Sequence, residues 1–324
     1  MRKKVTGRPS CLILCLAGCV TVAPGCAVKR WVTGTPAPSV ERGNPQYQTE
    51  EELLAIVTEL QRAADTDTYR FPIPKDVTGA NVYKATLARL RDYEAKHPGA
   101  YAGLVAFTRA RAYEGLREYE QAIAHYHIVS QTSHRLRDEA AQAADILARF
   151  QELRQRSLTA PTPSEYLRVL DARINDWQVR RQEVAGTRYE PLARQEEELL
   201  DQQKVAFLLV SRHHLEDGNS KVVEAYQQLL AKHRESKNFY RYQLELGDFY
   251  FTLAQEYVAR NDPETLAFHA DTFAELSQAA LRLYARVAQV DGMMEKLEAK
   301  GKLEALKAYM AQVGQLSLSL PRSP

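Results

Sequence analysis

The sequence is nearly free of cysteine and poor in the residues that break helices. Its four cysteines, Cys11, Cys15, Cys19 and Cys26, all precede residue 27. The remaining chain therefore has no thiolate nucleophile, disulfide or cysteine-ligated zinc. Fifteen glycines and fourteen prolines among 324 residues fall below the average share of about 12%, which argues against a turn-rich all-β fold and a glycine-rich phosphate loop. The net charge of +2 is too small to indicate a nucleic-acid-binding protein.

The familiar motifs of hydrolases and metal sites are missing as well. The chain has no His-Glu-x-x-His or Gly-x-Ser-x-Gly sequence, and Glu94 with His97 makes only a single Glu-x-x-His. His125 and His127 would point to opposite sides of a helix, because two residues span about 200°. The acidic run at 196–198 is interpreted as the solvated first turn of a helix. We therefore expect no metal, no cofactor and no catalytic residue.

The start of the chain carries a targeting signal. Basic residues and no acidic ones precede an apolar run over residues 11–17, as in a secretory signal peptide. Leu16-Ala17-Gly18-Cys19 then resembles the lipobox of bacterial lipoproteins, in which the cysteine is acylated and the chain is cleaved before it. The resemblance implies a signal peptide at 1–18 and lipidation of Cys19, with Cys26 as a weaker second candidate. An uncleaved membrane anchor over 9–28 is the alternative, although prolines and glycines interrupt it.

Residue 20 bears on the destination of such a lipoprotein. It is Val20 rather than Asp, which by resemblance to enterobacterial sorting favours the outer membrane, facing the periplasm, over the inner membrane. Loss of residues 1–18 would leave 39 of the 43 basic residues against 41 acidic ones. The positive balance therefore belongs to the leader. Residues 19–48 contain several prolines and glycines and are expected to form a flexible tether.

From residue 49 onward, apolar residues recur at intervals of three and four, which predicts an all-α fold. Thr49 and Glu52 form a capping box for the first helix, and Asp262 with Pro263 predicts another helix start. Other helices are expected at about 100–115, 118–131, 135–157, 220–234, 238–260, 263–290 and 293–311. Prolines at positions 161 and 163 would separate an N-terminal unit, 49–157, from a C-terminal unit, 164–311, followed by a tail, 312–324.

Residues 103–131 resemble a tetratricopeptide repeat, a helix-turn-helix unit of about 34 residues. The small residues of the motif match Ala110 and Ala122, and the aromatic residues match Tyr113 and Tyr126. Small residues let the two helices approach closely, and the rings fill the space between neighbouring helix pairs. The resemblance implies a solenoid of helical hairpins.

Two observations test this resemblance within the N-terminal half. Adding 34 to Ala110 gives Ala144, where a similar apolar pattern recurs. Arg109 and Arg117 depart from the motif, because the family has leucine and a turn glycine there. A generic helical bundle with the same spacing of alanine and tyrosine stays an alternative.

A second match lies downstream. Gly247 and Tyr250 resemble the first helix of a repeat, and Ala280 and Tyr284 resemble the second. Tyr250 and Ala280 are 30 residues apart, much farther than in the family. The two helices are therefore expected to be extended or separated by an additional turn.

The resemblance implies a concave groove lined by the first helix of each repeat. In the best match it places Leu104, Phe107, Arg111 and Glu114 on this partner-binding surface, although a preceding helix would cover Leu104 and Phe107 equally well. The sequence thus predicts a lipid-anchored scaffold or adaptor that binds other envelope proteins or peptides. A periplasmic enzyme with a scattered active site and a structural envelope-linking protein are the alternatives.

Overall fold

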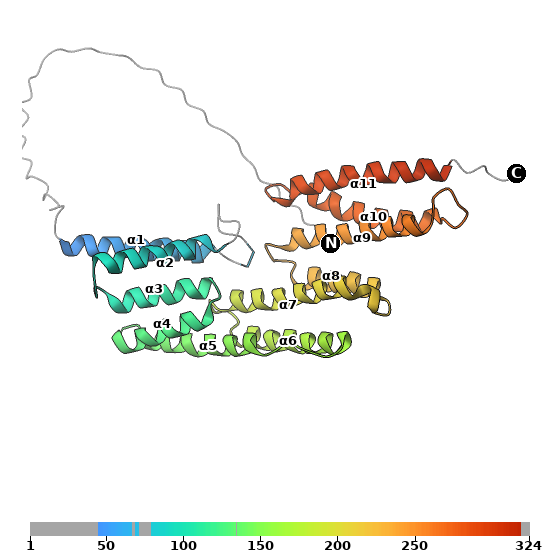
Figure 1. The fold of residues 1–324 in the computed structure, drawn as a ribbon. Helices are drawn as coiled ribbons and strands as arrows, with labels where there is room; N and C mark the ends of the chain where they lie inside the picture. Colours follow the sequence, from blue (N-terminus) through green and yellow to red (C-terminus); the bar gives the residue numbers. More distant parts are fainter. Residues whose placement is uncertain (1–44, 67–68, 71–78, 134, 319–324) are drawn as a thin grey trace, which may run out of the picture. The chain divides into compact units, whose positions relative to one another are not determined.

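Regular secondary structure in the described residues is entirely helical (Figure 1). The computed structural model describes residues 45–66, 69–70, 79–133 and 135–318, and these ranges contain no strand, which confirms the all-α fold class. None of the described helices has the length and hydropathy to cross a membrane. The helices are α1 Pro45–Thr66, α2 Asn81–Lys96, α3 Ala102–Gly115, α4 Tyr119–Thr132, α5 Arg137–Gln155, α6 Pro163–Glu183, α7 Glu190–Ser211, the 3-10 turn η1 Arg212–His214, α8 Gly218–Lys232, α9 Phe239–Arg260, α10 Ala270–Ala288 and α11 Glu295–Leu318.

Threonine and proline mark two of the helix starts. The Thr162 hydroxyl accepts a hydrogen bond from the backbone N–H of Glu165 at 3.2 Å, and Pro163 occupies the first turn of α6. Pro191 lies in the first turn of α7. Proline suits this position because the first turn leaves its backbone nitrogen without a helical acceptor.

Three predicted helix ends are wrong. α1 begins at Pro45, so Thr49 lies inside the helix, where its hydroxyl is 3.4 Å from Nδ1 of His97. Asp262 begins a separate turn by accepting a hydrogen bond from the backbone N–H of Glu264, and α10 begins only at Ala270. The Asp-Pro pair therefore starts a turn and not the long helix. α11 continues to residue 318, past the expected end at 311.

Each helix contacts its successor along the chain, from α1 to α11. The most extensive packing joins α3 to α4, α4 to α5, α9 to α10 and α10 to α11 (Figure 1). Contacts also skip one helix, between α1 and α3 and between α9 and α11. A helix that contacts both its successor and the helix after that buries two of its faces.

The hydrophobic core continues across the segment with the two prolines. Phe150 of α5 packs edge to face against Trp177 of α6, with ring centroids 5.1 Å apart, and against Tyr119 of α4 at 5.8 Å. All three rings are at most 1% exposed. Edge-to-face pairs stabilise cores beyond the area that they bury. The division into units at 49–157 and 164–311 stays a prediction.

Candidate functional site

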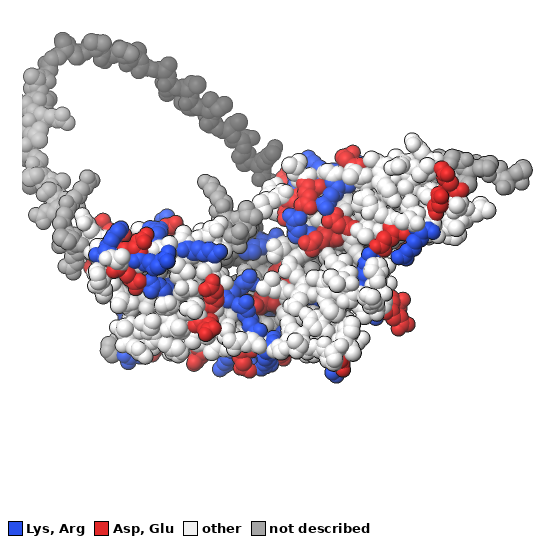
Figure 2. Space-filling view, in the orientation of Figure 1, with Lys and Arg blue, Asp and Glu red and all other residues white. Residues whose placement is uncertain are grey.

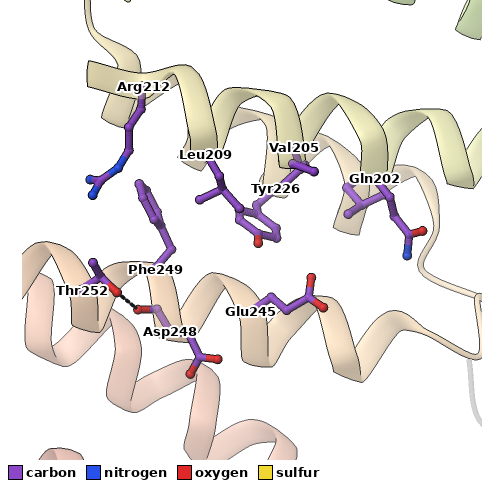
Figure 3. A pocket seen from close by; sticks show the side chains of 11 residues that line it. Gln202, Val205, Leu209, Arg212, Tyr226, Glu245, Asp248, Phe249 and Thr252 are labelled. Carbon is purple, nitrogen blue, oxygen red and sulfur yellow. Dashed lines mark hydrogen bonds between the residues drawn. The ribbon is translucent and has the colours of Figure 1, made fainter. Parts of the chain in front are cut away.

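An open pocket lies between α7, α8 and α9 (Figure 3). We call it the α7–α9 pocket. Its volume is about 710 Å³, which falls within the range of about 300–1,000 Å³ that is usual for ligand sites. The lining residues are Gln202, Val205, Ala206, Leu209, Arg212, Tyr226, Leu229, Glu245, Asp248, Phe249 and Thr252.

The floor of the α7–α9 pocket is apolar. Val205, Tyr226, Leu229 and Phe249 are each less than 5% exposed, and they belong to one hydrophobic cluster that joins the three helices. The same side chains therefore line the pocket and hold its walls together. We infer that core packing fixes the shape of this floor.

Arg212 lies at one end of the pocket, and its charge is neutralised within the protein. Its guanidinium lies 5.4 Å from the ring centroid of Phe249 and makes two hydrogen bonds to the carboxylate of Glu256, one of them at 3.1 Å. The hydrogen bond from Arg212 lowers the pKa of Glu256, against the opposing effect of burial. Paired in this bidentate way, Arg212 offers little positive charge to a ligand.

Asp248 also finds its partners inside the protein. Lys302 Nζ lies 2.8 Å from both of its carboxylate oxygens, and the Tyr284 hydroxyl donates a hydrogen bond at 2.6 Å. In Figure 3 this side chain points away from α7. Its negative charge is therefore directed away from the pocket and balanced by Lys302.

Glu245 differs from Arg212 and Asp248, because no described residue forms a hydrogen bond or an ion pair with it. It lies one helical turn before Phe249 and extends from α9 into the space below α7 (Figure 3). Burial raises the pKa of the Glu245 carboxyl, against the opposing charge of Arg241, and the negative charges of Asp248 and Glu298 raise it further. The pocket thus combines an apolar floor with one unpaired, partly buried carboxylate.

Three consecutive glutamates of α7 are buried, so their interpretation as a solvated first turn is wrong. Glu196, Glu197 and Glu198 are at most 5% exposed. Successive residues of a helix point about 100° apart, and each carboxylate therefore needs its own neighbours. These are Tyr119 for Glu196, Arg181 and Lys232 for Glu197, and Ser236, Asn238 and Tyr242 for Glu198.

Gln202 connects this buried network to the α7–α9 pocket. Its side-chain amide donates a hydrogen bond to the Tyr242 hydroxyl, which in turn donates to Glu198. Burial and the negative charge of Glu198 raise the pKa of Tyr242, so the hydroxyl keeps its proton. The buried carboxylate therefore orients a polar side chain at the edge of the pocket.

Tyr69, which follows α1 in the chain, lies near the same part of α7. The Tyr69 hydroxyl lies 2.6 Å from Nδ1 of His233, and Nε2 of that ring lies 2.8 Å from Asp201. The backbone N–H of Lys237 donates to the Tyr69 carbonyl at 3.0 Å. Burial raises the pKa of Tyr69, as does the negative charge of Glu198. Hydrogen bonds thus link Tyr69 to His233 at the end of α8 and, through His233, to Asp201 of α7.

A second depression, of about 560 Å³, adjoins this contact, and we call it the methionine groove. Its walls come from Arg70, the α3–α4 turn, α7, the beginning of α9 and the turn before α11. Leu199, Met293 and Met294 are 40%, 39% and 66% exposed there. Methionine side chains adapt to irregular apolar partners, so this groove is a second candidate contact surface.

The four residues predicted to line a partner groove take different positions on α3. Leu104 packs against the cluster formed with α1 and α2, and Phe107 packs edge to face against Tyr126 at 5.6 Å. Glu114 is 5% exposed and accepts a hydrogen bond from Tyr126 at 2.6 Å, and Arg111 lies 3.9 Å from it. None of the four lines the α7–α9 pocket or the methionine groove. Their contact with a partner stays a prediction.

The N-terminal residues predicted to pack the repeats lie at helix contacts. Ala110, Ala122 and Tyr126 have no exposed surface. Tyr113 is partly buried and stacks on His125, with ring centroids 5.5 Å apart. The small residues therefore lie where α3 and α4 meet.

The C-terminal match shows the same relationship between α9 and α10. Ala280 and Tyr284 have no exposed surface, and Tyr250 is partly buried against the surrounding clusters. A Cβ at Gly247 would lie 2.6 Å from the ring of Tyr284. A glycine is therefore needed where this ring crosses α9.

Sequence reasoning missed the α7–α9 pocket. Glu245 and Asp248 interrupt an apolar stretch that includes Leu244, Leu246 and Phe249. Acidic residues inside such a stretch were a usable signal, because a carboxylate beside core residues is costly unless it is paired. The residues of α7 and α8 that complete the pocket are not marked by any motif.

No protein-family model matches the chain, and no curated protein or solved structure matches it either. Among the residues that the structure describes, no group of three or more His, Cys, Asp or Glu side chains is placed to hold a metal ion. Cys19, the predicted lipidation site, lies outside the described residues. Function is therefore inferred from the pocket, the groove and the N-terminal motif.

Proposed function

We propose that this protein is a lipid-anchored scaffold or adaptor of the bacterial cell envelope, which binds other envelope proteins or peptides through its helical surface. The sequence Leu16-Ala17-Gly18-Cys19 supports the anchor and assigns the lipid to Cys19. Val20 supports an outer-membrane location facing the periplasm.

The helices are proposed to be repeats of the tetratricopeptide type. The successive packing of neighbouring helices supports this, as does the contact between α1 and α3 and between α9 and α11. The close approach of Gly247 to Tyr284 supports it in the C-terminal half, where a small residue and a ring meet as the motif requires.

The α7–α9 pocket carries the binding part of the proposal. Protein interfaces concentrate their free energy in a few anchor side chains that fill pockets on the partner. A volume of about 710 Å³ above an apolar floor accommodates such an anchor. The open side of the pocket gives a larger partner access to it.

Site-specific photo-crosslinking tests partner binding. A photoreactive residue replaces Ala206 in the α7–α9 pocket, Leu199 in the methionine groove, or the exposed Ala124 of α4 as a matched surface control. We expect discrete crosslinked products from position 206 or 199 and none from position 124. Equal, diffuse crosslinking at all three positions would contradict a partner-binding surface.

Metabolic labelling with a palmitate analogue tests the anchor separately. We expect Cys19→Ala to abolish labelling and Cys26→Ala to leave it unchanged. Full labelling of Cys19→Ala would show that Cys19 is not the lipidated residue. Neither substitution alters the folded helices, because both positions precede α1.

A further inference from the structure

The α7–α9 pocket has a residual negative charge. Of its three charged side chains, Arg212 is paired with Glu256, and Asp248 is paired with Lys302 and points away. Glu245 has no hydrogen bond or ion pair among the described residues; the nearby Arg241 lowers its pKa by charge alone and is itself paired with Glu295 and Glu298. Partial removal of a carboxylate from water without a counter-ion costs free energy, and a cation entering the pocket would offset that cost.

We propose that the α7–α9 pocket receives a lysine or arginine side chain from an apolar segment of a partner protein, with Glu245 as its counter-ion. This inference rests on the proposed function and specifies the chemistry of the partner. The charge of the pocket selects a basic group, and its floor selects the apolar residues beside it.

The shape of the pocket matches the two parts of a long basic side chain. Lysine and arginine bury their methylene groups against apolar surface and keep the charge at the far end. Val205, Tyr226 and Leu229 provide such a surface, and Glu245 lies across from them on α9 (Figure 3). The methylenes would contact these residues while the cation reaches the carboxylate.

The surface around the pocket favours a protein segment over a free small amine. Ala206 lies at the exposed rim of the pocket, and Val210 follows it one helical turn later with 81% of its surface exposed. Residues four apart share one face of a helix. The apolar surface therefore extends beyond the pocket, where a small amine would leave it uncovered and an apolar segment would cover it.

A second copy of the chain is the competing occupant of the pocket. Acidic and basic side chains are interspersed on the face that Figure 2 shows. Arg70, Arg89, Arg109 and Arg181 are examples that already pair with glutamates. Only a basic side chain that is not already paired, such as one supplied by a partner protein, can enter the pocket without breaking such a pair.

The experiment crosslinks the full-length protein in its native envelope from position 206, in three backgrounds. These are the wild-type pocket, Glu245→Gln, and Glu224→Gln as a control that removes one exposed carboxylate of α8 outside the pocket. We expect mass spectrometry to find a crosslinked segment with a lysine or arginine between apolar residues. Glu245→Gln should reduce the crosslinking yield about tenfold, equivalent to about 1.4 kcal/mol, and Glu224→Gln should leave it unchanged.

The outcomes separate this inference from the proposed function. A crosslinked segment without a basic residue, or an undiminished yield in Glu245→Gln, overturns the inference and leaves the adaptor function intact. The same holds if crosslinks form at Leu199 but not at Ala206, or if the partner is a second copy of this chain. If no position gives a crosslink above the Ala124 control, both proposals fail.

Discussion

The Tyr69 hydroxyl lies 2.6 Å from Nδ1 of His233, although 164 residues separate the two in sequence. Asp201 lies 2.8 Å from Nε2 of the same ring, so both ring nitrogens of His233 have a hydrogen-bond partner. The Tyr69 ring also lies 5.7 Å from the guanidinium of Arg194. These contacts hold Tyr69 against α7 and the end of α8, beside the methionine groove.

Tyr69→Phe is expected to lower the free energy of unfolding by about 2 kcal/mol, because it leaves a buried ring nitrogen of His233 without its hydrogen-bond partner. It should also speed hydrogen exchange of the Lys237 amide, which donates to the Tyr69 carbonyl. Denaturant unfolding and hydrogen exchange measure the two effects. Tyr101→Phe serves as the control, because the Tyr101 hydroxyl bonds to Glu50 at the exposed surface and its loss should cost little. Equal destabilisation by both substitutions would contradict a special role for the buried chain.

The turn between α3 and α4 contains a correctable strain. Arg117, which replaces the turn glycine of the tetratricopeptide motif, has a positive φ of 59°. A residue with a Cβ is destabilised by about 1 kcal/mol in this left-handed region, whereas glycine is not. Arg117→Gly should therefore raise the free energy of unfolding by about 0.5–1 kcal/mol, measured by denaturant unfolding.

A second arginine provides the contrast for this measurement. Arg149 is exposed in the interior of α5, where Arg149→Gly should lower stability by about 1 kcal/mol. The same arginine-to-glycine substitution should thus raise the free energy of unfolding at position 117 and lower it at position 149. A loss of stability in both variants would show that the Arg117 side chain contributes more than its backbone strain costs.

Sequence patterns predicted the helices better than their ends. Thr49 and Thr162 both precede a glutamate by three residues, yet only Thr162 caps a helix. The backbone upstream of Thr49 is already helical from Pro45, so that hydroxyl has no free helix end to cap. A capping motif therefore indicates where a helix can start, but the actual start also depends on the residues that precede the motif.

The buried charges show why the candidate site was harder to predict. In sequence, three adjacent glutamates from position 196 are typical of a solvated surface. Their burial depends on partners that lie 77 residues away in the case of Tyr119 and 44 in the case of Tyr242. Local spacing contains no information on such contacts. By contrast, Gly247 and Tyr284 were both identified in the sequence, because a known motif has small and aromatic residues at such positions, although their contact was not predicted.

The Gly247–Tyr284 contact predicts a strong effect of a single methyl group. Gly247→Ala should lower the free energy of unfolding by about 1–3 kcal/mol, because the new Cβ would lie 2.6 Å from the Tyr284 ring. Gly301→Ala on α11 is the matched control, since no atom lies within 4 Å of a Cβ there. It should stabilise the helix by about 0.5–1 kcal/mol. Thermal and denaturant unfolding measure both changes, and stabilisation by Gly247→Ala would refute the close approach.

The unpaired state of Glu245 predicts a distinctive dependence on pH. Its pKa in the folded protein is raised, so the ionised carboxylate destabilises the fold at neutral pH, and this penalty disappears as pH falls through the raised pKa. Glu245→Gln should therefore be more stable than the wild type at pH 7, with the difference shrinking as the pH is lowered. The charge of Arg241 favours the ionised carboxylate, whereas the charges of Asp248 and Glu298 disfavour it. The pH at which the stability difference is half lost reflects all three charges.

The stability of the fold should depend on the ionisation of Glu256 in the opposite direction. Arg212 lowers its pKa, so its charge stabilises the fold above the ordinary carboxyl pKa and this contribution is lost as pH falls through the lowered value. Glu256→Gln should accordingly be less stable than the wild type at pH 7, with a deficit that shrinks in acid. Denaturant unfolding from pH 3 to 8 compares the two variants. If Glu245→Gln instead follows Glu256→Gln, then Glu245 already has a counter-ion within the protein and has no need of one from a partner.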